Sequence, residues 1–441
     1  MNFVTREKAS LCAAIAMGLG VSTGSPPAMV VAAGMPIVCF MPATRRAAFE
    51  STLGYYVAAM WPMVLGLERY LGGNAWPVAI AIWISAAILL SLPWTMAWTS
   101  DRAHFVWRAP LALVMTVVPP LGIIGLASPL CGAGYLFPGT RWIGLAMTTC
   151  LPGIILSTAA LSFRRRCVVV CFVIGFAGGV AVEGHLFPPN PVEAPIGWTA
   201  VNTSFGDVSQ PFRDFAAFEF IQQKSADLTA RVLIFPEAVV PRWSDATRLF
   251  WHTSLDRARA RGQILALGAG LPAAQTQTPP DYREELHELA ALDFAAALDA
   301  LKSADKPHAN CGIAPAPGSI KPHAEPTDNA MVIVGAESGT FYQRVPVPVG
   351  MWRPFSRTSV PVRLAGPGVI TIDHQRTAVL ICYEQMITWP VLVSMLQHPT
   401  VIVGISNTFW VDHTSIPRYQ SSALRGWARL FRLPCFSAVN S

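Results

Sequence analysis

The stretch AVLICYEQM, residues 378–386, places four apolar residues before a cysteine, with a glutamate two positions after it. A short apolar run of this length predicts a buried β-strand, and the residues from about 385 to 396 predict a helix. Cys382 therefore ends a strand and begins a strand-to-helix turn. Two interpretations remain open at this point, a nucleophile presented at a turn or a small residue of the core.

Strands and helices alternate on both sides of this stretch. We predict helices at about 212–229, 245–261, 385–396 and 416–433, and strands at 196–205, 231–239, 263–270, 329–338, 339–347, 368–374, 376–384, 400–407 and 434–440. Such alternation predicts an α/β sheet covered by helices. Residues 272–328, which are rich in Pro, Ala, Gln and His and contain one amphipathic helical pattern, are interpreted as an insertion.

The first part of the chain has a different composition. Up to about residue 188 it consists of long apolar stretches, so we predict a transmembrane domain at 1–188 and an exported soluble domain at 189–441. A bilayer is crossed by about 20 apolar residues. The stretches suggest about seven spans, at 10–24, 27–43, 48–66, 75–97, 109–129, 142–162 and 167–185. The first two are short and Gly-rich, which leaves a single span or a re-entrant hairpin open.

The basic residues predict the orientation of these spans. With a cytoplasmic N-terminus, only Arg69 and Arg141 fall in outward loops, and the inward segments carry Arg6, Lys8, Arg45, Arg46, Arg102, Arg108, Arg164, Arg165 and Arg166. We therefore expect a multi-pass protein of the bacterial inner membrane with its C-terminal domain in the periplasm. The net charge of +6 is explained largely by the basic residues that orient the spans in the membrane, so no direct nucleic acid binding is expected. The Arg triplet at 164–166 would also fit a nucleic-acid patch.

The nine cysteines are scattered. They form no CxxC pair and no metal-ligand spacing, and the histidines of the second half show none either, so we expect neither a metal nor another cofactor. Cys311, Cys382 and Cys435 fall in the exported part, and their odd number leaves at least one thiol unpaired.

Glu237 follows an apolar run in the same way as Cys382. A thiol nucleophile needs a base within hydrogen-bond reach and donors for the developing oxyanion. The turn after a strand can direct the first N–H groups of the next helix at that anion. A partly buried carboxylate such as Glu237 can serve as the base, although a glutamate at a strand end is more often a cap or half of a salt bridge.

Three motifs together resemble the nitrilase, or carbon-nitrogen hydrolase, superfamily. They are LIFPEAVVPRW (233–243), VLICYEQM (379–386) and VGISNTFW (403–410). Several spans followed by an exported domain resemble the membrane-embedded branch, apolipoprotein N-acyltransferase. A family of conjugal transfer membrane proteins shares this plan and a segment similar to PVPVGMWRP (346–354).

The resemblance implies an α-β-β-α sandwich from about residue 195 and assigns roles to particular residues. Cys382 would be the nucleophile that forms an acyl-enzyme, and Glu237 the general base. Tyr383 would contribute a backbone donor and Glu384 a supporting carboxylate. The strand TVIVGISN leads to Asn407 and Trp410, which would line the pocket with Trp352, although aromatic residues at such places also fit a core or a membrane-facing rim.

The family lysine that stabilises the tetrahedral intermediate has no counterpart at its expected position. In YQRVPVPVGMW (342–352) that position holds Gln343, with Arg344 beside it, and Met351 replaces the acid that follows in the acyltransferases. Arg344 could substitute for the lysine, or it could point to solvent on an alternating strand. Loss of a cation and an anion together avoids an uncompensated buried charge.

Three functions follow as alternatives. The first is a nitrilase-type membrane protein of plasmid conjugal transfer that performs Cys-dependent amide hydrolysis or acyl transfer at the periplasmic face. The second is apolipoprotein N-acyltransferase, and the third is a non-catalytic envelope scaffold. The expected partners are a phospholipid or lipoprotein substrate and other conjugation or envelope proteins.

Overall fold

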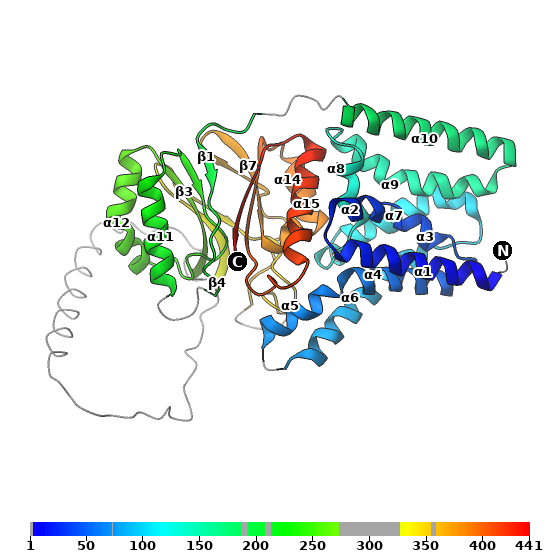
Figure 1. Ribbon diagram of the computed structural model, residues 1–441, viewed down its shortest axis with the longest axis horizontal. Helices are drawn as coiled ribbons and strands as arrows, with labels where there is room; N and C mark the ends of the chain where they lie inside the picture. The colour runs from blue at the N-terminus through cyan, green and yellow to red at the C-terminus, as the bar shows by residue number, and fades with distance from the viewer. Residues whose placement is uncertain (1–2, 73, 187–192, 208–212, 273–326, 354–358) are drawn as a thin grey trace.

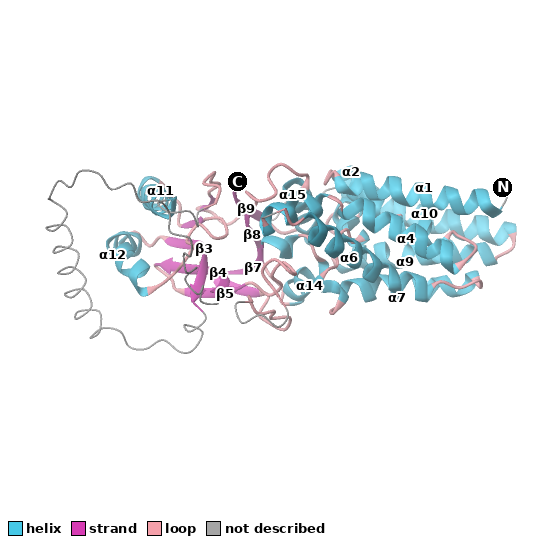
Figure 2. Ribbon diagram, turned by 90° about the horizontal axis from the view of Figure 1, so that it is seen from below, coloured by secondary structure: helices cyan, strands magenta, loops and turns pink. Residues whose placement is uncertain are grey.

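The computed structural model describes residues 3–72, 74–186, 193–207, 213–272, 327–353 and 359–441. A helical region comes first in the chain and a region with two β-sheets follows (Figure 1). The two regions pack end to end in an elongated molecule, as the second view shows (Figure 2). The predicted insertion at 272–328 lies almost wholly outside the described residues, as does Cys311.

The helical region consists of apolar helices joined by short loops. Thr44 caps one of them through a hydrogen bond from Ala47 N–H (3.2 Å), and Gly18 allows the first helix to approach the backbone of Tyr55 closely. The α-helices are α1 (Phe3–Ser22), α2 (Pro26–Ala32), α3 (Met35–Phe40), α4 (Arg45–Met60), α5 (Pro62–Leu71), α6 (Trp76–Ala97), α7 (Phe105–Val117), α8 (Ala133–Leu136), α9 (Trp142–Ser157) and α10 (Phe163–Leu186).

Three of these helical segments are long and apolar enough to cross a membrane. They are Trp76–Ala97, Trp142–Ala160 and Phe163–Leu186, and they coincide with three of the seven predicted spans. The prediction for 27–43 falls on α2 and α3, which a turn divides, and that for 109–129 begins in α7, which ends at Val117. The count of seven spans stays a prediction, and three candidate spans indicate association with a membrane.

The first sheet has five strands in the order β1-β2-β3-β4-β5. β1 to β3 are parallel, and β4 and β5 are antiparallel to their neighbours. Helices α11 (Arg213–Asp227) and α12 (Asp245–Ala260), both close to their predicted ranges, cover one face through a buried cluster that includes Trp243 and Trp251. The strands are β1 (Trp198–Ala200), β2 (Val232–Ile234), β3 (Ile264–Pro272), β4 (Thr327–Gly335) and β5 (Gly339–Tyr342).

The second sheet has four strands in the order β6-β7-β8-β9. β6 (Val369–Ile372) and β7 (Gln375–Ile381) form a hairpin, which turns at Asp373 and His374 with left-handed φ values of 47° and 61°. β8 (Val401–Asn407) and β9 (Cys435–Asn440) continue the sheet in parallel. After β7 come the short 3-10 helix η6 (Cys382–Gln385) and α14 (Thr388–Leu396), and α15 (Ile416–Phe431) follows β8.

The two sheets pack face to face and the helices lie outside them. Apolar side chains of both sheets, Ile234 and Met331 from the first and Val379 and Val403 from the second, share one fully buried cluster. On the outer face of the second sheet, α14 and α15 belong to a cluster that continues into the helical region (Figures 1 and 2). This packing holds the ends of β2 and β7 next to each other and close to the membrane helices.

Candidate active site

Glu237 is held at the end of β2 by a tight backbone. Phe235 N–H still bonds to Ala266 on β3 (2.8 Å), and the chain then leaves the sheet through Pro236. The next residue, Ala238, adopts a left-handed φ of 56°. Gly268 on β3 lies against the backbone of Pro236 and Glu237, where a Cβ would overlap both residues. Glu237 is 4% exposed, so its carboxyl points into the protein.

Cys382 lies at a strained turn directly after β7. Its φ is 50°, in the left-handed region that costs a residue with a Cβ about 1–2 kcal/mol. The side chain of Glu384 stabilises this turn, because its Oε2 accepts a hydrogen bond from the Ile381 N–H (3.1 Å). Such conformations persist where the surroundings enforce them, and they are frequent at catalytic residues. The thiol itself is buried.

The structure brings Cys382 and Glu237 together, as the positions of both at strand ends predict. The thiol and the carboxyl form a hydrogen bond. Burial raises the pKa of Glu237, and hydrogen bonds from Cys382, Asn329 and Asn407 oppose the increase. Burial also raises the pKa of Cys382 well above its ordinary value, and the neighbouring Glu237 raises it further. The raised pKa keeps the proton on the thiol, which lies beside a carboxyl group of the kind that can act as a general base.

Backbone donors surround the thiol. The N–H groups of Asn407 and Tyr383 both bond to the Cys382 sulfur and thereby lower the pKa of the thiol. The Asn407 N–H also donates to Glu237 Oε2 (2.9 Å). Donors at this place can stabilise a thiolate.

The sequence did not reveal Asn329 as a site residue. It lies on β4, and its Nδ2 donates to Glu237 Oε1 (2.5 Å) and to Gln343 Oε1 (3.0 Å). Gln343, predicted as a supporting residue, is fully buried and donates from Nε2 to the Ile381 carbonyl (3.2 Å). The signal that could have shown Asn329 is its place beside Asp328, two polar residues at the start of an otherwise apolar strand.

Arg344 does not contact the thiol but forms a buried ion pair with Glu384. Its Nε lies 3.3 Å from Glu384 Oε1, and the two side chains are 2% and 0% exposed. The rest of the guanidinium donates to the carbonyls of Val379 and Pro390 and to the Ser394 hydroxyl. These contacts correct both expectations for Arg344. It neither points to solvent nor replaces the family lysine, and it instead fixes the turn of Cys382 to β7 and α14.

Glu384, predicted as a supporting carboxylate, has four N–H partners. Its Oε1 accepts from Arg344 N (2.7 Å), Arg344 Nε (3.3 Å) and Val345 N (3.1 Å), and its Oε2 accepts from Ile381 N. A buried charge needs such partners. Glu384 therefore joins the segment after β5 to the turn that carries Cys382.

Of the predicted pocket residues, Asn407 ends strand β8, and Trp410 and Trp352 lie on loops. Trp410 donates from Nε1 to Asn407 O (3.1 Å), and its ring meets Tyr70 edge to face at 5.6 Å. Tyr70 comes from α5 and was not predicted, because nothing in the sequence of the helical region indicates a contact with a residue as distant in the chain as Trp410. Trp352 closes a tight turn by bonding to the Val347 carbonyl (3.0 Å). In the described part of the chain, no cluster of His, Cys, Asp and Glu could hold a metal ion.

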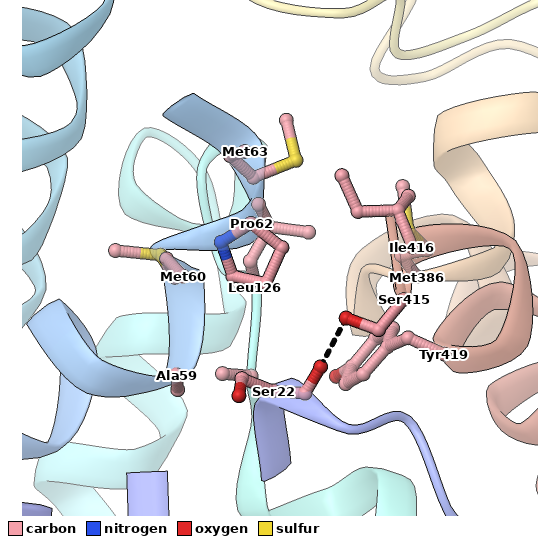
Figure 3. A pocket seen from close by; sticks show the side chains of 11 residues that line it. Ser22, Ala59, Met60, Pro62, Met63, Leu126, Met386, Ser415, Ile416 and Tyr419 are labelled. Carbon is pink, nitrogen blue, oxygen red and sulfur yellow. Dashed lines mark hydrogen bonds between the residues drawn. The ribbon is translucent and has the colours of Figure 1, made fainter. Parts of the chain in front are cut away.

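Two apolar pockets lie where the helical region meets the second sheet. The first is lined by helix α4 and α5 residues, by Met386 and by Tyr419, and the Ser415 hydroxyl bonds to the Ser22 carbonyl across it (Figure 3). The second shares Met60, Met63 and Leu126 with the first and reaches Tyr383, the neighbour of Cys382. The Tyr383 hydroxyl donates to the carbonyl of Ile123 in the helical region (2.9 Å).

No protein-family model matches the sequence. Two curated proteins are similar to it along nearly its whole length. "Probable conjugal transfer protein TraB" of Sinorhizobium fredii is 27% identical over 442 residues, which cover 97% of this chain and 97% of the relative. "Conjugal transfer protein TraB" of Agrobacterium fabrum is 26% identical over 462 residues, 99% of this chain and 94% of the relative.

Proposed function

We propose that this chain is a membrane-anchored nitrilase-type protein of plasmid conjugal transfer, with Cys382 as the nucleophile of an amide or acyl-transfer reaction. The names of the two relatives carry the conjugal role. One observation carries the chemistry: Cys382 is held in a left-handed conformation with its thiol hydrogen-bonded to the buried carboxyl of Glu237. A residue that served packing alone would gain nothing from this strain.

The reaction would proceed in two steps through a thioester. Glu237 accepts the thiol proton as the Cys382 sulfur attacks a carbonyl carbon, and backbone N–H groups at the turn, Tyr383 first, stabilise the oxyanion. Glu237 then returns the proton to the leaving amine or alcohol as its bond to carbon breaks. Water or an acceptor amine attacks the thioester and gives its proton to Glu237, the bond from carbon to the Cys382 sulfur breaks, and Glu237 returns the proton to the leaving thiolate.

The layer order supports the nitrilase-type part of the proposal. Helices α11 and α12, two face-to-face sheets, and helices α14 and α15 follow one another, and the nitrilase resemblance implies this arrangement. Glu237 and Cys382 lie directly after strands β2 and β7, which belong to different sheets. Because a fold alone does not determine an activity, the site carries the functional argument.

The apolar pockets favour a substrate with an alkyl chain. They lie between the helical region and the turn of Cys382, and their lining consists mainly of aliphatic and methionine side chains, with two serines, two tyrosines and one tryptophan. A phospholipid or a lipoprotein would present its ester or amide at the membrane surface while its chain occupies such a space. Apolipoprotein N-acyltransferase is the weaker alternative, because Gln343 and Met351 replace the lysine and acid of that enzyme.

The location follows from the charge distribution. Basic residues concentrate in the segments that face inward if the N-terminus is cytoplasmic, so we place the chain in the bacterial inner membrane with residues after about 190 in the periplasm. A C-terminal alkaline phosphatase fusion is then active and a C-terminal GFP fusion is dark. The opposite result would overturn the orientation.

Plasmid transfer tests the functional proposal. In a donor whose own copy is deleted, the Cys382→Ala variant should transfer the plasmid as poorly as the deletion, at equal protein level. The matched control is Cys435→Ala, which removes another thiol of the same sheet on β9 and should restore wild-type transfer. If Cys382→Ala transfers the plasmid as well as the wild type, the catalytic role is overturned. The chain would then act as a non-catalytic scaffold that binds other envelope or conjugation proteins.

A further inference from the structure

Asn329 connects the general base to the strand end that carries the nucleophile. Its amide nitrogen, in a residue that is 7% exposed, has two acceptors, Glu237 Oε1 and Gln343 Oε1. Its backbone carbonyl accepts the Gln343 N–H (2.8 Å). Gln343 in turn donates to Ile381, the residue before Cys382. A chain of neutral hydrogen bonds thus runs from Glu237 to the turn of the nucleophile.

This amide bridge lies where the nitrilase resemblance expects a lysine. The cation in this segment, Arg344, is directed at Glu384 instead. Both oxygens of Glu237 are held by neutral donors, Oε1 by Asn329 and Oε2 by the Asn407 N–H. With both oxygens fixed, the carboxyl plane is set with respect to the thiol, and proton transfer needs that geometry.

We infer that Asn329 is a positioning residue of the site, which with Gln343 takes the place of a cation and holds the Glu237 carboxyl toward the Cys382 thiol. The inference rests on the proposed function, because it concerns the base of that reaction. Asn329 acts through Glu237, so its removal should matter only while the carboxyl is present. This dependence separates positioning from a general contribution to stability.

A double-mutant cycle tests the dependence. The full-length protein in detergent is incubated with p-nitrophenyl octanoate, and the rate of acylation of the Cys382 peptide is followed by mass spectrometry. Glu237→Gln should lower this rate about 100-fold or more. Asn329→Leu should lower it at least about tenfold in the wild-type background and less than about twofold in the Glu237→Gln background. Asn329→Ser, which is too short to bridge, should repeat the result if the leucine variant folds poorly.

The control variant is Gln263→Leu. Gln263 is also a buried amide, but it bonds to the carbonyls of Leu228 and Ala230, away from the site. Its effect should be equal in both backgrounds. Equal effects of Asn329→Leu in both backgrounds would overturn the inference and leave the proposed function intact. Failure of the wild-type protein to form an adduct on Cys382 would overturn both, because no base would then need positioning.

A pH profile gives a readout that a structural role would not move. The charged and titratable groups around the thiol are Glu237, Glu384, Arg344, Tyr70 and Arg353. Gln343→Lys adds an ammonium beside them, and the pH of half-maximal Cys382 alkylation by iodoacetamide should fall by at least about one unit. Thr340→Lys, an exposed position on β5, should leave it unchanged. No shift with Gln343→Lys would mean that position 343 does not face the pair and would contradict the bridge.

Discussion

The Cys382 thiol and the Glu237 carboxyl meet although they belong to different sheets of the molecule. Glu237 follows β2 of the first sheet and Cys382 follows β7 of the second, and burial, the charge of Glu237 and their hydrogen bond all raise the pKa of the thiol. The pair therefore depends on the packing of the sheets. This relationship makes the reactivity of the thiol sensitive to changes at the carboxyl, at the backbone below it and at the turn.

The first prediction concerns the acidity of the thiol. The charge of Glu237 and its hydrogen bond both raise the pKa of Cys382, so Glu237→Gln should lower that pKa and shift iodoacetamide alkylation of Cys382 to lower pH. Reaction with an acyl ester should slow in the same variant, because the base is lost. The profile is measured by peptide mass spectrometry from neutral to strongly alkaline pH, because burial raises the pKa of the wild-type thiol well above the ordinary value of about 8.5. A shift to higher pH would contradict the contact.

The second prediction concerns the buried ion pair. Arg344→Met leaves Glu384 without its cation and should lower the free energy of unfolding by about 3–5 kcal/mol. Arg259→Ala, which breaks the exposed pair with Asp256, should cost less than about 1 kcal/mol. Thermal unfolding in detergent measures both. Equal stability of the Arg344 variant and the wild type would mean that this pair does not hold the turn.

The third prediction concerns the backbone under Glu237. In Gly268→Ala the new methyl group would overlap Pro236 and Glu237, so we expect a loss of about 1–3 kcal/mol and slower acylation of Cys382. Gly339→Ala is the control, since a Cβ there meets Ile370 and Ile333 only at 3.3 and 3.5 Å. Wild-type acylation by Gly268→Ala would show that the Glu237 backbone can move without effect.

The fourth prediction concerns the link between the turn of Cys382 and the helical region. Tyr383→Phe removes the hydrogen bond to Ile123 and should cost about 0.5–1.5 kcal/mol. The control is Tyr342→Phe, whose ring packs on the Arg363 guanidinium and keeps that contact, and which should change stability by less than about 0.5 kcal/mol. Equal effects of the two substitutions on thermal unfolding would mean that the hydrogen bond from Tyr383 to Ile123 does not stabilise the protein.

The sequence predicted the pair and part of its surroundings, including Glu384 and Asn407, but not the contacts of Arg344 and Asn329. Cys382 and Glu237 each follow an apolar strand, and both expected strand ends lie at one edge of the packed sheets. Gln343 and Arg344 are neighbours, so their side chains point to opposite sides of an extended segment, and composition does not tell which side faces the thiol. Asn329 lies 92 positions from Glu237, and only the pairing of β3 with β4 brings it near. The strand pattern of the soluble part was recovered well because its hydrophobic runs are short and regular.

The central claim is that Cys382 forms a thioester with the help of Glu237. The most direct measurement is mass spectrometry of the Cys382 peptide after membranes carrying the protein are incubated with p-nitrophenyl octanoate. The account predicts an octanoyl adduct on Cys382 that hydroxylamine removes and that Glu237→Gln reduces about 100-fold or more. An unmodified Cys382, or an adduct that forms equally fast without the Glu237 carboxylate, would contradict it.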